Sequence, residues 1–257
     1  MSEGPDHATT DEGPDHATTD EGPDHATTDE GPDHATTDEG PDHATTDEGL
    51  PIVAPPFEER KGGDHARVGG VLLAAGTSDR FGDRNKLLAT VDGDALVRHA
   101  ARTLVDAGVD PIVAVVGHDA EDVTAALGGL DVETVPNPAY AQGQSSSVRV
   151  GITALEDRST SVDAAVLALG DMPFVDPATV EALVAAYEAG VGDALAAAYD
   201  GVRGNPVLFD RRFFADLTDV EGDVGGRKIL LESDDSACVA VSDEGVRHDI
   251  DEPTDLP

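Results

Sequence analysis

An apolar run that breaks into a glycine-punctuated loop constrains this chain more than any other feature. Residues 71–75 read Val-Leu-Leu-Ala-Ala, and the following loop carries glycines at Gly76 and Gly82 and cations at Arg80 and Lys86. A short, continuously apolar run is typical of a buried strand in a parallel sheet, and α/β proteins bind ligands at the carboxyl ends of such strands. The pattern predicts an α/β fold whose first loop lies at a binding edge.

This loop has the chemistry of an anion site. Thr77 and Ser78 supply hydroxyls, and the glycines allow close approach of backbone N–H groups to an anion. Arg80 can bind phosphate oxygens bidentately, and Lys86 is a compact positive charge. The loop lacks both the Gly-Lys-Ser/Thr end of a P-loop and the Gly-x-Gly-x-x-Gly of dinucleotide folds. Glycine spacing alone would fit an ordinary surface turn, but the whole string predicts a phosphate site.

The chain divides into two unlike parts. Residues 4–48 are five copies of Gly-Pro-Asp-His-Ala-Thr-Thr-Asp-Glu, without any Val, Ile, Leu or aromatic residue. Such a segment cannot offset the entropy of ordering, so we expect residues 1–49 to be a disordered acidic tail. Its repeated histidines leave metal binding as an alternative. We expect residues 50–66, which contain several prolines, to be a linker and residues 67–257 to form one domain.

The charge balance narrows the range of partners. The chain has 53 acidic and 16 basic residues, a net charge of −37. Residues 1–49 carry 16 of the acidic and none of the basic residues, which leaves −21 on the remainder. This acidity resembles that of proteins from halophilic archaea, whose molar-salt cytoplasm screens self-repulsion; an acidic interaction protein is the alternative. A nucleic-acid partner is disfavoured because phosphate backbones need a basic face.

No signal-peptide core or membrane-length apolar segment is found in the sequence, so we expect a cytoplasmic protein without a membrane partner. The single cysteine, Cys238, lies in a strand-like run and is expected to be a small buried side chain. His99, His118 and His248 have no partner at a convincing spacing, so we assign them structural roles.

Strand-like and helical patterns alternate along the remainder of the chain, as in βαβ units. Strands are expected at residues 71–75, 111–117, 132–135, 164–169, 194–198, 206–209, 238–241 and 246–250. Helices are expected at 94–107, 119–127 and 144–156, and from Pro177, with Asp176 as cap and Gly190 beyond the end. The predicted architecture is a three-layer α/β/α sandwich with a mainly parallel sheet.

Asp171 is a second candidate for chemistry. It follows the expected strand 164–169 directly, within Gly-Asp-Met-Pro. A carboxylate at the carboxyl edge of the sheet is the kind of ligand that Mg²⁺ takes in phosphoryl-transfer sites. Its position alone would equally fit a turn or helix-cap aspartate.

Several strings together resemble one family. Leu-Ala-Ala-Gly at 73–76, followed by Arg80, Gly82 and Lys86-Leu-Leu, resembles the signature of MobA/MocA-like nucleotidyltransferases, most closely the molybdenum cofactor cytidylyltransferase branch. Leu-Gly-Asp-Met-Pro at 169–173, the segment 137–151 and the ending Asp-Ile-Asp-Glu-Pro at 249–253 resemble further motifs of that family. The resemblance covers nearly all of the chain from Arg67 onward and implies a Rossmann-like nucleotidyltransferase fold. Phe81 stands where the family has Met.

The resemblance implies Mg²⁺-dependent transfer of a nucleoside monophosphate to a phosphorylated acceptor, with release of pyrophosphate. The Ala-Ala-Gly string favours CTP, and hence molybdopterin as acceptor. Arg80 and Lys86 would be catalytic, and Asp171 and Asp251 would hold the metal, although Asp251 could instead hold the acceptor. The implied nucleotide contacts are Ala74, Ala75, Gly76, Thr77, Gly82, Gly143 and Ser147.

The acceptor is expected near residues 203–209 and 222–227, where the chain carries Asn205 in place of the family's usual His. This substitution leaves the acceptor open. The alternatives are a guanylyltransferase, a sugar-phosphate or phospholactate nucleotidyltransferase, and a nucleotide-binding module without turnover. An acidic scaffold whose tail binds partners is a further class. The oligomeric state is left open.

Overall fold

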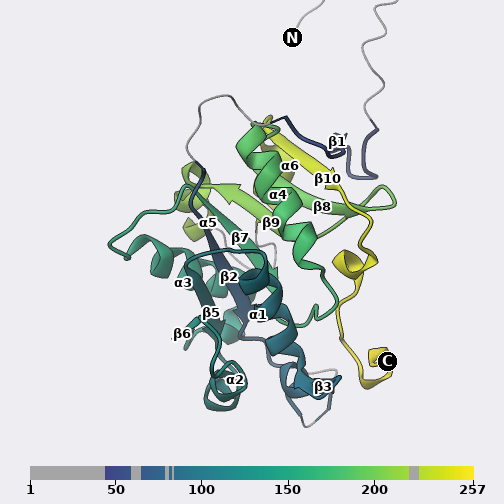
Figure 1. Ribbon diagram of the computed structural model, residues 1–257. Helices are drawn as coiled ribbons and strands as arrows, with labels where there is room; N and C mark the ends of the chain where they lie inside the picture. The colour runs from purple at the N-terminus through teal and green to yellow at the C-terminus, as the bar shows by residue number, and fades with distance from the viewer. Residues whose placement is uncertain (1–43, 59–64, 79–80, 83, 220–225) are drawn as a thin grey trace, which may run out of the picture. The chain divides into compact units, whose positions relative to one another are not determined.

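The computed structural model describes residues 44–58, 65–78, 81–82, 84–219 and 226–257 (Figure 1). Within them, eight strands form one sheet in the order β1-β10-β8-β9-β7-β2-β5-β6. β9 runs antiparallel to both of its neighbours, and the other pairs are parallel. The strands are β1 (Ile52–Val53), β2 (Val68–Ala74), β5 (Ile112–Val116), β6 (Glu133–Pro136), β7 (Ala164–Leu169), β8 (Ala194–Tyr199), β9 (Val202–Asp210) and β10 (Ser236–Ala240). A separate ribbon pairs β3 (Thr90–Val91) with β4 (Asp94–Ala95).

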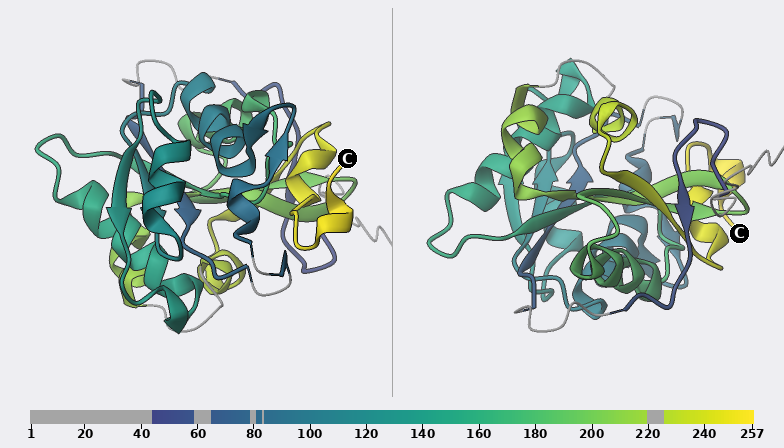
Figure 2. Two further views of the ribbon diagram at one scale, coloured as in Figure 1. Left: turned by 90° about the horizontal axis from the view of Figure 1, so that it is seen from below. Right: turned by 90° about the horizontal axis from the view of Figure 1, so that it is seen from above.

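Helices cover both faces of the sheet, which Figure 2 shows nearly edge-on between them. On one face pack α1 (Leu96–Asp106), α2 (Ala120–Ala126) and α4 (Pro177–Ala189). On the other pack α3 (Gln144–Glu156), α5 (Phe214–Asp219) and α6 (Arg227–Glu232). The predicted three-layer α/β/α sandwich with a mainly parallel sheet is confirmed.

The sequence of β2 explains how one strand serves both cores. Side chains alternate across a strand, so Leu72 packs in the core under α1 while Val71 packs in the core under α3. Both are fully buried. Gly151 lets α3 approach closely, since a Cβ there would lie 2.3 Å from a methyl carbon of Val71. This packing fixes α3 against the middle of β2.

Local signals place the ends of α4 as predicted. The side chain of Asp176 accepts a hydrogen bond of 2.8 Å from the backbone N–H of Ala178, and Pro177 opens the helix. Gly190 ends it with φ of +74°, a left-handed conformation that glycine adopts without strain.

The single cysteine, Cys238, is fully buried in β10, as predicted, and burial raises the pKa of its thiol to about 11.

One expected strand is wrong. Residues 246–250 form no strand; instead, a 3₁₀ helix, η5, spans Glu244–Arg247. One side-chain oxygen of Asp243 accepts a hydrogen bond of 2.9 Å from the N–H of Gly245, and the other accepts one of 2.8 Å from the hydroxyl of Thr179. Such local bonds stabilise a turn at the expense of a strand.

The residues expected to form a linker also differ from that interpretation. Ile52–Val53 pair with β10 as the edge strand β1, and the preceding Leu50 is buried. Thr45 bridges to Pro51 in antiparallel fashion, so the end of the last repeat folds back on β1. A proline is tolerated beside an edge strand, which has no further neighbour to bond. A two-residue strand with prolines nearby gives no recognisable strand pattern, so the sequence alone predicted a linker.

A truncation pair tests where the folded part begins. Deleting residues 1–43 is expected to leave the melting temperature in molar KCl unchanged, whereas deleting residues 1–53 is expected to lower it by about 5 °C or more. Burial of one leucine side chain contributes about 1.5–3 kcal/mol, and each kcal/mol shifts the midpoint by about 2–4 °C at this size. Calorimetric melting curves measure both. Equal midpoints for the two truncations would contradict a structural role for residues 44–53.

Among the described residues, no helix combines the length and the apolar character that crossing a membrane requires.

Candidate active site

Three strand ends meet at one edge of the sheet and supply the site. The loop after β2 begins at Ala75, the turn after β7 contains Asp171, and the segment after β6 leads into α3. These strands run parallel, so their carboxyl ends and the loops that follow lie together. Sequence reasoning expected this edge to bind the ligand.

The loop after β2 is tied together by its own side chains. The Ser78 hydroxyl accepts a hydrogen bond of 3.1 Å from the N–H of Lys86 and lies 3.2 Å from the side-chain oxygen of Asn85. Gly76 lines the cavity, and a Cβ built on it would meet no atom within 4 Å. Gly82 has φ of +83°, a conformation that L side chains rarely adopt. Arg80 lies outside the described residues.

Asn85 orients Lys86, a role that sequence analysis did not recognise. Its buried side-chain oxygen accepts a hydrogen bond of 3.0 Å from the N–H of Leu87, which caps the 3₁₀ helix η2 (Lys86–Leu88). Its amide group donates to the carbonyl of His118 at 3.2 Å. An asparagine directly before a short helix is a capping signal that was available in the sequence.

Lys86 lies between the two aspartates that were predicted as metal ligands. Its Nζ is 2.6 Å from Oδ2 of Asp171 and 2.7 Å from Oδ1 of Asp251. The backbone N–H of Ile250 donates to the carbonyl of Asp171 at 2.9 Å, which brings the end of the chain to this place. Burial lowers the pKa of Lys86, but the two carboxylates outweigh it, so the pKa lies above its ordinary value. Lys86 is therefore protonated at neutral pH.

The two carboxylates are also potential ligands of a divalent cation. Oδ2 of Asp171 and Oδ1 of Asp251 both contact the Nζ of Lys86, so a cation bound at that point would take the place of the ammonium; both side chains remain partly exposed. Hard carboxylate oxygens that converge at the edge of a phosphate site suit Mg²⁺, which completes its shell with water and substrate oxygens. Among the described residues, no group of three or more His, Cys, Asp or Glu side chains could hold a metal, so the ligand set needs such additional oxygens.

The segment after β6 forms the other wall. The 3₁₀ helix η3 (Tyr140–Gln142) leads to Gly143, whose φ of +103° favours glycine and which precedes α3. The buried amide of Asn137 donates to the hydroxyls of Ser146 and Ser147 at 2.9 and 3.0 Å. Asn137 thus fixes the first turn of α3, and sequence analysis did not assign it this role.

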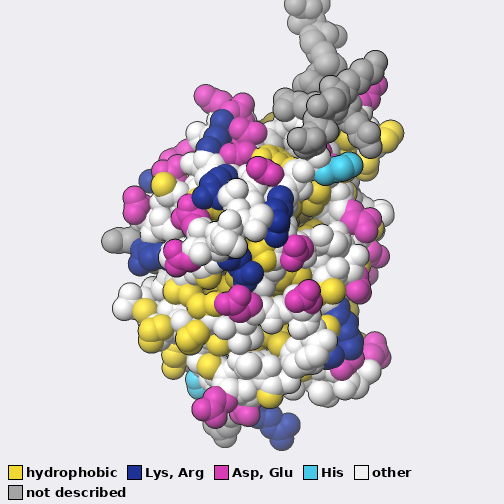
Figure 3. Space-filling model, turned by 60° about the vertical axis from the view of Figure 1, so that its left-hand side comes forward, with side chains coloured by type: hydrophobic (Ala, Val, Ile, Leu, Met, Phe, Trp, Pro, Cys, Tyr) yellow, Lys and Arg dark blue, Asp and Glu magenta, His cyan; other side chains and the backbone are white. Residues whose placement is uncertain are grey.

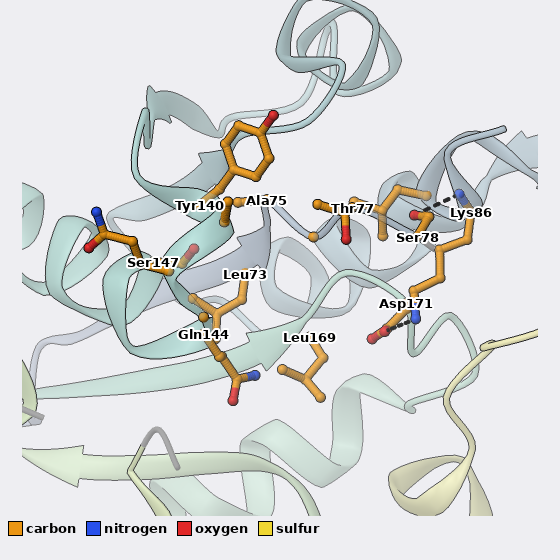
Figure 4. A pocket seen from close by; sticks show the side chains of 15 residues that line it. Leu73, Ala75, Thr77, Ser78, Lys86, Tyr140, Gln144, Ser147, Leu169 and Asp171 are labelled. Atoms are coloured by element: carbon orange, nitrogen blue, oxygen red, sulfur yellow. Dashed lines mark hydrogen bonds and ion pairs between the residues drawn. The ribbon is translucent and has the colours of Figure 1, made fainter. Parts of the chain in front are cut away.

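These walls enclose a cavity of about 580 Å³. Figure 4 shows Thr77, Ser78, Lys86 and Asp171 at one end, and Tyr140, Gln144 and Ser147 at the other. It is lined by Leu73, Ala75, Gly76, Thr77, Ser78, Lys86, Leu87, Tyr140, Ala141, Gln142, Gly143, Gln144, Ser147, Leu169 and Asp171. A cavity of this volume, with hydroxyl, ammonium and carboxylate groups at one end and an aromatic ring at the other, suits a ligand with a phosphate chain and a heterocycle.

The structure brings most of the predicted site residues together. Ala75, Gly76, Thr77, Gly143 and Ser147 line the cavity. Ala74 does not: its side chain is fully buried in the core under α1. Gly82 is also outside the lining, and Asp251 reaches the site through Lys86.

A second, smaller cavity of about 190 Å³ adjoins the first and shares Leu73, Gln144 and Leu169 with it. Its far side holds Arg203, Asn205 and Arg227. This is the region that sequence analysis associated with the acceptor.

Figure 3 shows basic side chains on one face of the molecule interspersed with acidic ones, rather than gathered in one broad basic patch.

A glycine-bearing loop at the end of a parallel strand, with an ion-paired lysine beside a cavity, is an arrangement by which α/β proteins bind phosphate compounds. Residues 70–237 match the sequence profile of the MobA-like NTP transferase domain. The chain belongs to this family, and it is a nucleotidyltransferase of the MocA-like kind. The predicted membership of the MobA/MocA-like family and the predicted class of enzyme, a nucleotidyltransferase, are confirmed.

One relative and two solved structures are each similar to more than 70% of this chain. The chain is 30% identical over 191 residues to the nicotine blue oxidoreductase of Paenarthrobacter nicotinovorans, which covers 72% of this chain and 92% of that protein. The crystal structure of Rv0371c from Mycobacterium tuberculosis superposes with a TM-score of 0.64 at 28% identity, over 75% of this chain and 96% of that one. A nucleotidyl transferase from Methanothermobacter thermautotroptrophicus superposes with a TM-score of 0.61 at 25% identity, over 74% and 94%. Rv0371c has also been solved in complex with manganese.

Proposed function

We propose that this protein transfers CMP from CTP to a phosphorylated acceptor, molybdopterin, in a Mg²⁺-dependent reaction that releases pyrophosphate. The observation that carries the proposal is the Lys86 ammonium held between Asp171 and Asp251 at the phosphate-loop end of the large cavity. Binding of manganese by Rv0371c supports a divalent cation in a related protein. The Ala-Ala-Gly string at residues 74–76, where β2 ends, supports the choice of CTP.

The residues of the site suit phosphoryl transfer without a general base. An acceptor phosphate is already anionic, so the protein has to align its oxygen with the α-phosphorus and stabilise charge on the equatorial oxygens. Lys86 and the backbone N–H groups of the loop supply that stabilisation. Asp171 and Asp251 would hold the Mg²⁺, which when bound neutralises phosphate charge and orients the triphosphate. Tyr140, Gly143 and Ser147 shape the end of the cavity that we assign to cytidine.

Two other functions use the same site and are distinguished by the nucleotide and turnover measurements described below. A guanylyltransferase, or an enzyme that uses a sugar phosphate or phospholactate, would use the same Lys86 site with a different nucleotide or acceptor. Asn205, where the family usually has His, favours a nucleotide-binding module without turnover if it marks a lost acceptor site. Only a measurement of pyrophosphate release distinguishes such a module from an active enzyme.

Nucleotide preference is the direct test. We expect CTP to bind at least about tenfold more tightly than GTP in the presence of Mg²⁺, and we expect chelation of the metal to weaken binding of both. Titration calorimetry in molar KCl measures this, and a pyrophosphate-release assay with candidate acceptors tests turnover. A preference for GTP, or binding that is indifferent to Mg²⁺, would overturn the cytidylyl assignment. Binding without pyrophosphate release for any acceptor would favour the module without turnover.

A further inference from the structure

One side chain of the last copy of the nine-residue repeat contacts two arginines that line the second cavity. The carboxylate of Glu48 lies 2.5 Å from Nε of Arg203 and 2.6 Å from a terminal nitrogen of Arg227. Arg203 comes from β9 and Arg227 from the start of α6, so two guanidinium groups from distant parts of the chain converge on one carboxylate. Hydrogen bonding to Arg203 is the largest cause that holds the pKa of Glu48 below its ordinary value.

A tight turn holds Glu48 in place. The N–H of Gly49 donates to the carbonyl of Thr46 at 2.9 Å, and the hydroxyl of Thr46 accepts a bond of 3.1 Å from the N–H of Leu50. Gly49 has φ of +85°, which the turn requires. Leu50 and β1 then anchor the turn to the sheet. The turn is thus pre-formed, and Glu48 reaches the arginines without ordering a flexible segment.

Sequence shows why the fifth copy takes this position. Every copy of the repeat ends in Asp-Glu, but only the fifth is followed by Gly-Leu-Pro-Ile-Val, which supplies the buried leucine and the edge strand. The other four copies lie outside the described residues. The anchor therefore fixes the register of Glu48 against Arg203 and Arg227.

Besides forming ion pairs with Glu48, Arg203 and Arg227 line a cavity. This second cavity shares the lining residues Leu73, Gln144 and Leu169 with the larger one. Two guanidinium groups aimed at one oxyanion match the geometry by which proteins bind phosphate. The chain has only 16 basic residues, and two of them meet here beside the phosphate-loop cavity.

We propose that Arg203 and Arg227 bind the phosphate group of the acceptor and that Glu48 occupies this site as an intramolecular competitor until the acceptor displaces it. The proposal rests on the proposed function for the identity of the natural ligand, but binding of an anion at the pair is independent of nucleotide. A carboxylate that must leave before a phosphate can enter lowers the apparent affinity for that phosphate, because only the fraction of molecules with a vacant site can bind. In this proposal the last residue of the acidic repeat, Glu48, regulates binding of the acceptor.

Binding of inorganic phosphate to the full-length chain, at constant KCl and without nucleotide, tests this proposal. We expect Glu48→Gln to bind phosphate about tenfold more tightly than the unmodified protein. Asp47→Asn removes the same charge from an exposed position of the same turn and serves as the matched control, with unchanged affinity. Adding Arg203→Gln to Glu48→Gln is expected to abolish the gain. Titration calorimetry measures all four proteins.

The possible results separate a binding site from a structural ion pair. If Glu48 only fastens the turn, Glu48→Gln lowers the melting temperature and leaves phosphate affinity at the level of Asp47→Asn, which overturns the proposal. A gain that persists with Arg203→Gln overturns it as well. Glu48→Asp keeps the charge but shortens the reach by one methylene, and an affinity between those of the parent and Glu48→Gln supports competition. Failure of CTP turnover would leave these results intact, so the two proposals fail separately.

Discussion

Replacing Lys86 by alanine is expected to lower the rate of pyrophosphate release by about 10² or more, with little change in the binding of CTP. The ammonium is a cation at the phosphate-loop end of the cavity, 13% exposed and bonded to two carboxylates. Charge that develops on phosphate oxygens in the transition state is stabilised by such a pre-positioned donor, and removal of one such donor typically costs 10²–10³ in rate. Single-turnover kinetics separate the chemical step from binding.

Lys228→Ala is the matched control, because that lysine lies on the exposed face of α6, 4.0 Å from Glu232. It is expected to react at the unmodified rate. The raised pKa of Lys86 keeps it protonated throughout the neutral range, so its contribution to stability is lost only as the pH rises through that raised value. The rate should therefore show no fall near neutral pH that arises from this group. A rate for Lys86→Ala equal to that of Lys228→Ala would remove Lys86 from the mechanism.

Sequence reasoning located the parts of the site that depend on single strands and their ends. β2, β7 and α3 were predictable because a short apolar run, a glycine-bounded strand and a helical pattern are all local signals. The rule that parallel strands end at one edge then brought Lys86 and Asp171 to the same place. The structure supports this juxtaposition with a distance of 2.6 Å.

Contacts between distant segments were beyond that reasoning. Glu48 meets Arg227 across 179 positions of the chain, and nothing in either local sequence indicates the partner. The strand expected at 246–250 failed for a related reason, since Asp243 bonds to Thr179 on α4 and holds the chain in a turn. The short strand β1 forms because it pairs with the edge of β10, and the sequence of its own two residues does not indicate that pairing.

Asp171→Asn tests the other half of the charge arrangement and is expected to lower turnover by about 10² or more. The substitution removes the carboxylate that lies 2.6 Å from Lys86 and, in our proposal, one of two protein ligands of Mg²⁺. An asparagine oxygen is a weaker ligand for a hard cation and does not neutralise the ammonium. The concentration of Mg²⁺ that gives half-maximal rate should therefore rise, which a purely structural role for Asp171 would not cause.

Asp200→Asn provides the matched control for that experiment. Asp200 is exposed at the turn between β8 and β9, with φ of +50°, a conformation that asparagine also adopts readily. We expect its rate and its Mg²⁺ dependence to equal those of the unmodified protein, and circular dichroism verifies that both variants fold. If Asp171→Asn loses rate without any change in its Mg²⁺ dependence, Asp171 acts by positioning Lys86 and the metal assignment is wrong. If it loses neither, the aspartate at the end of β7 has no part in the chemistry.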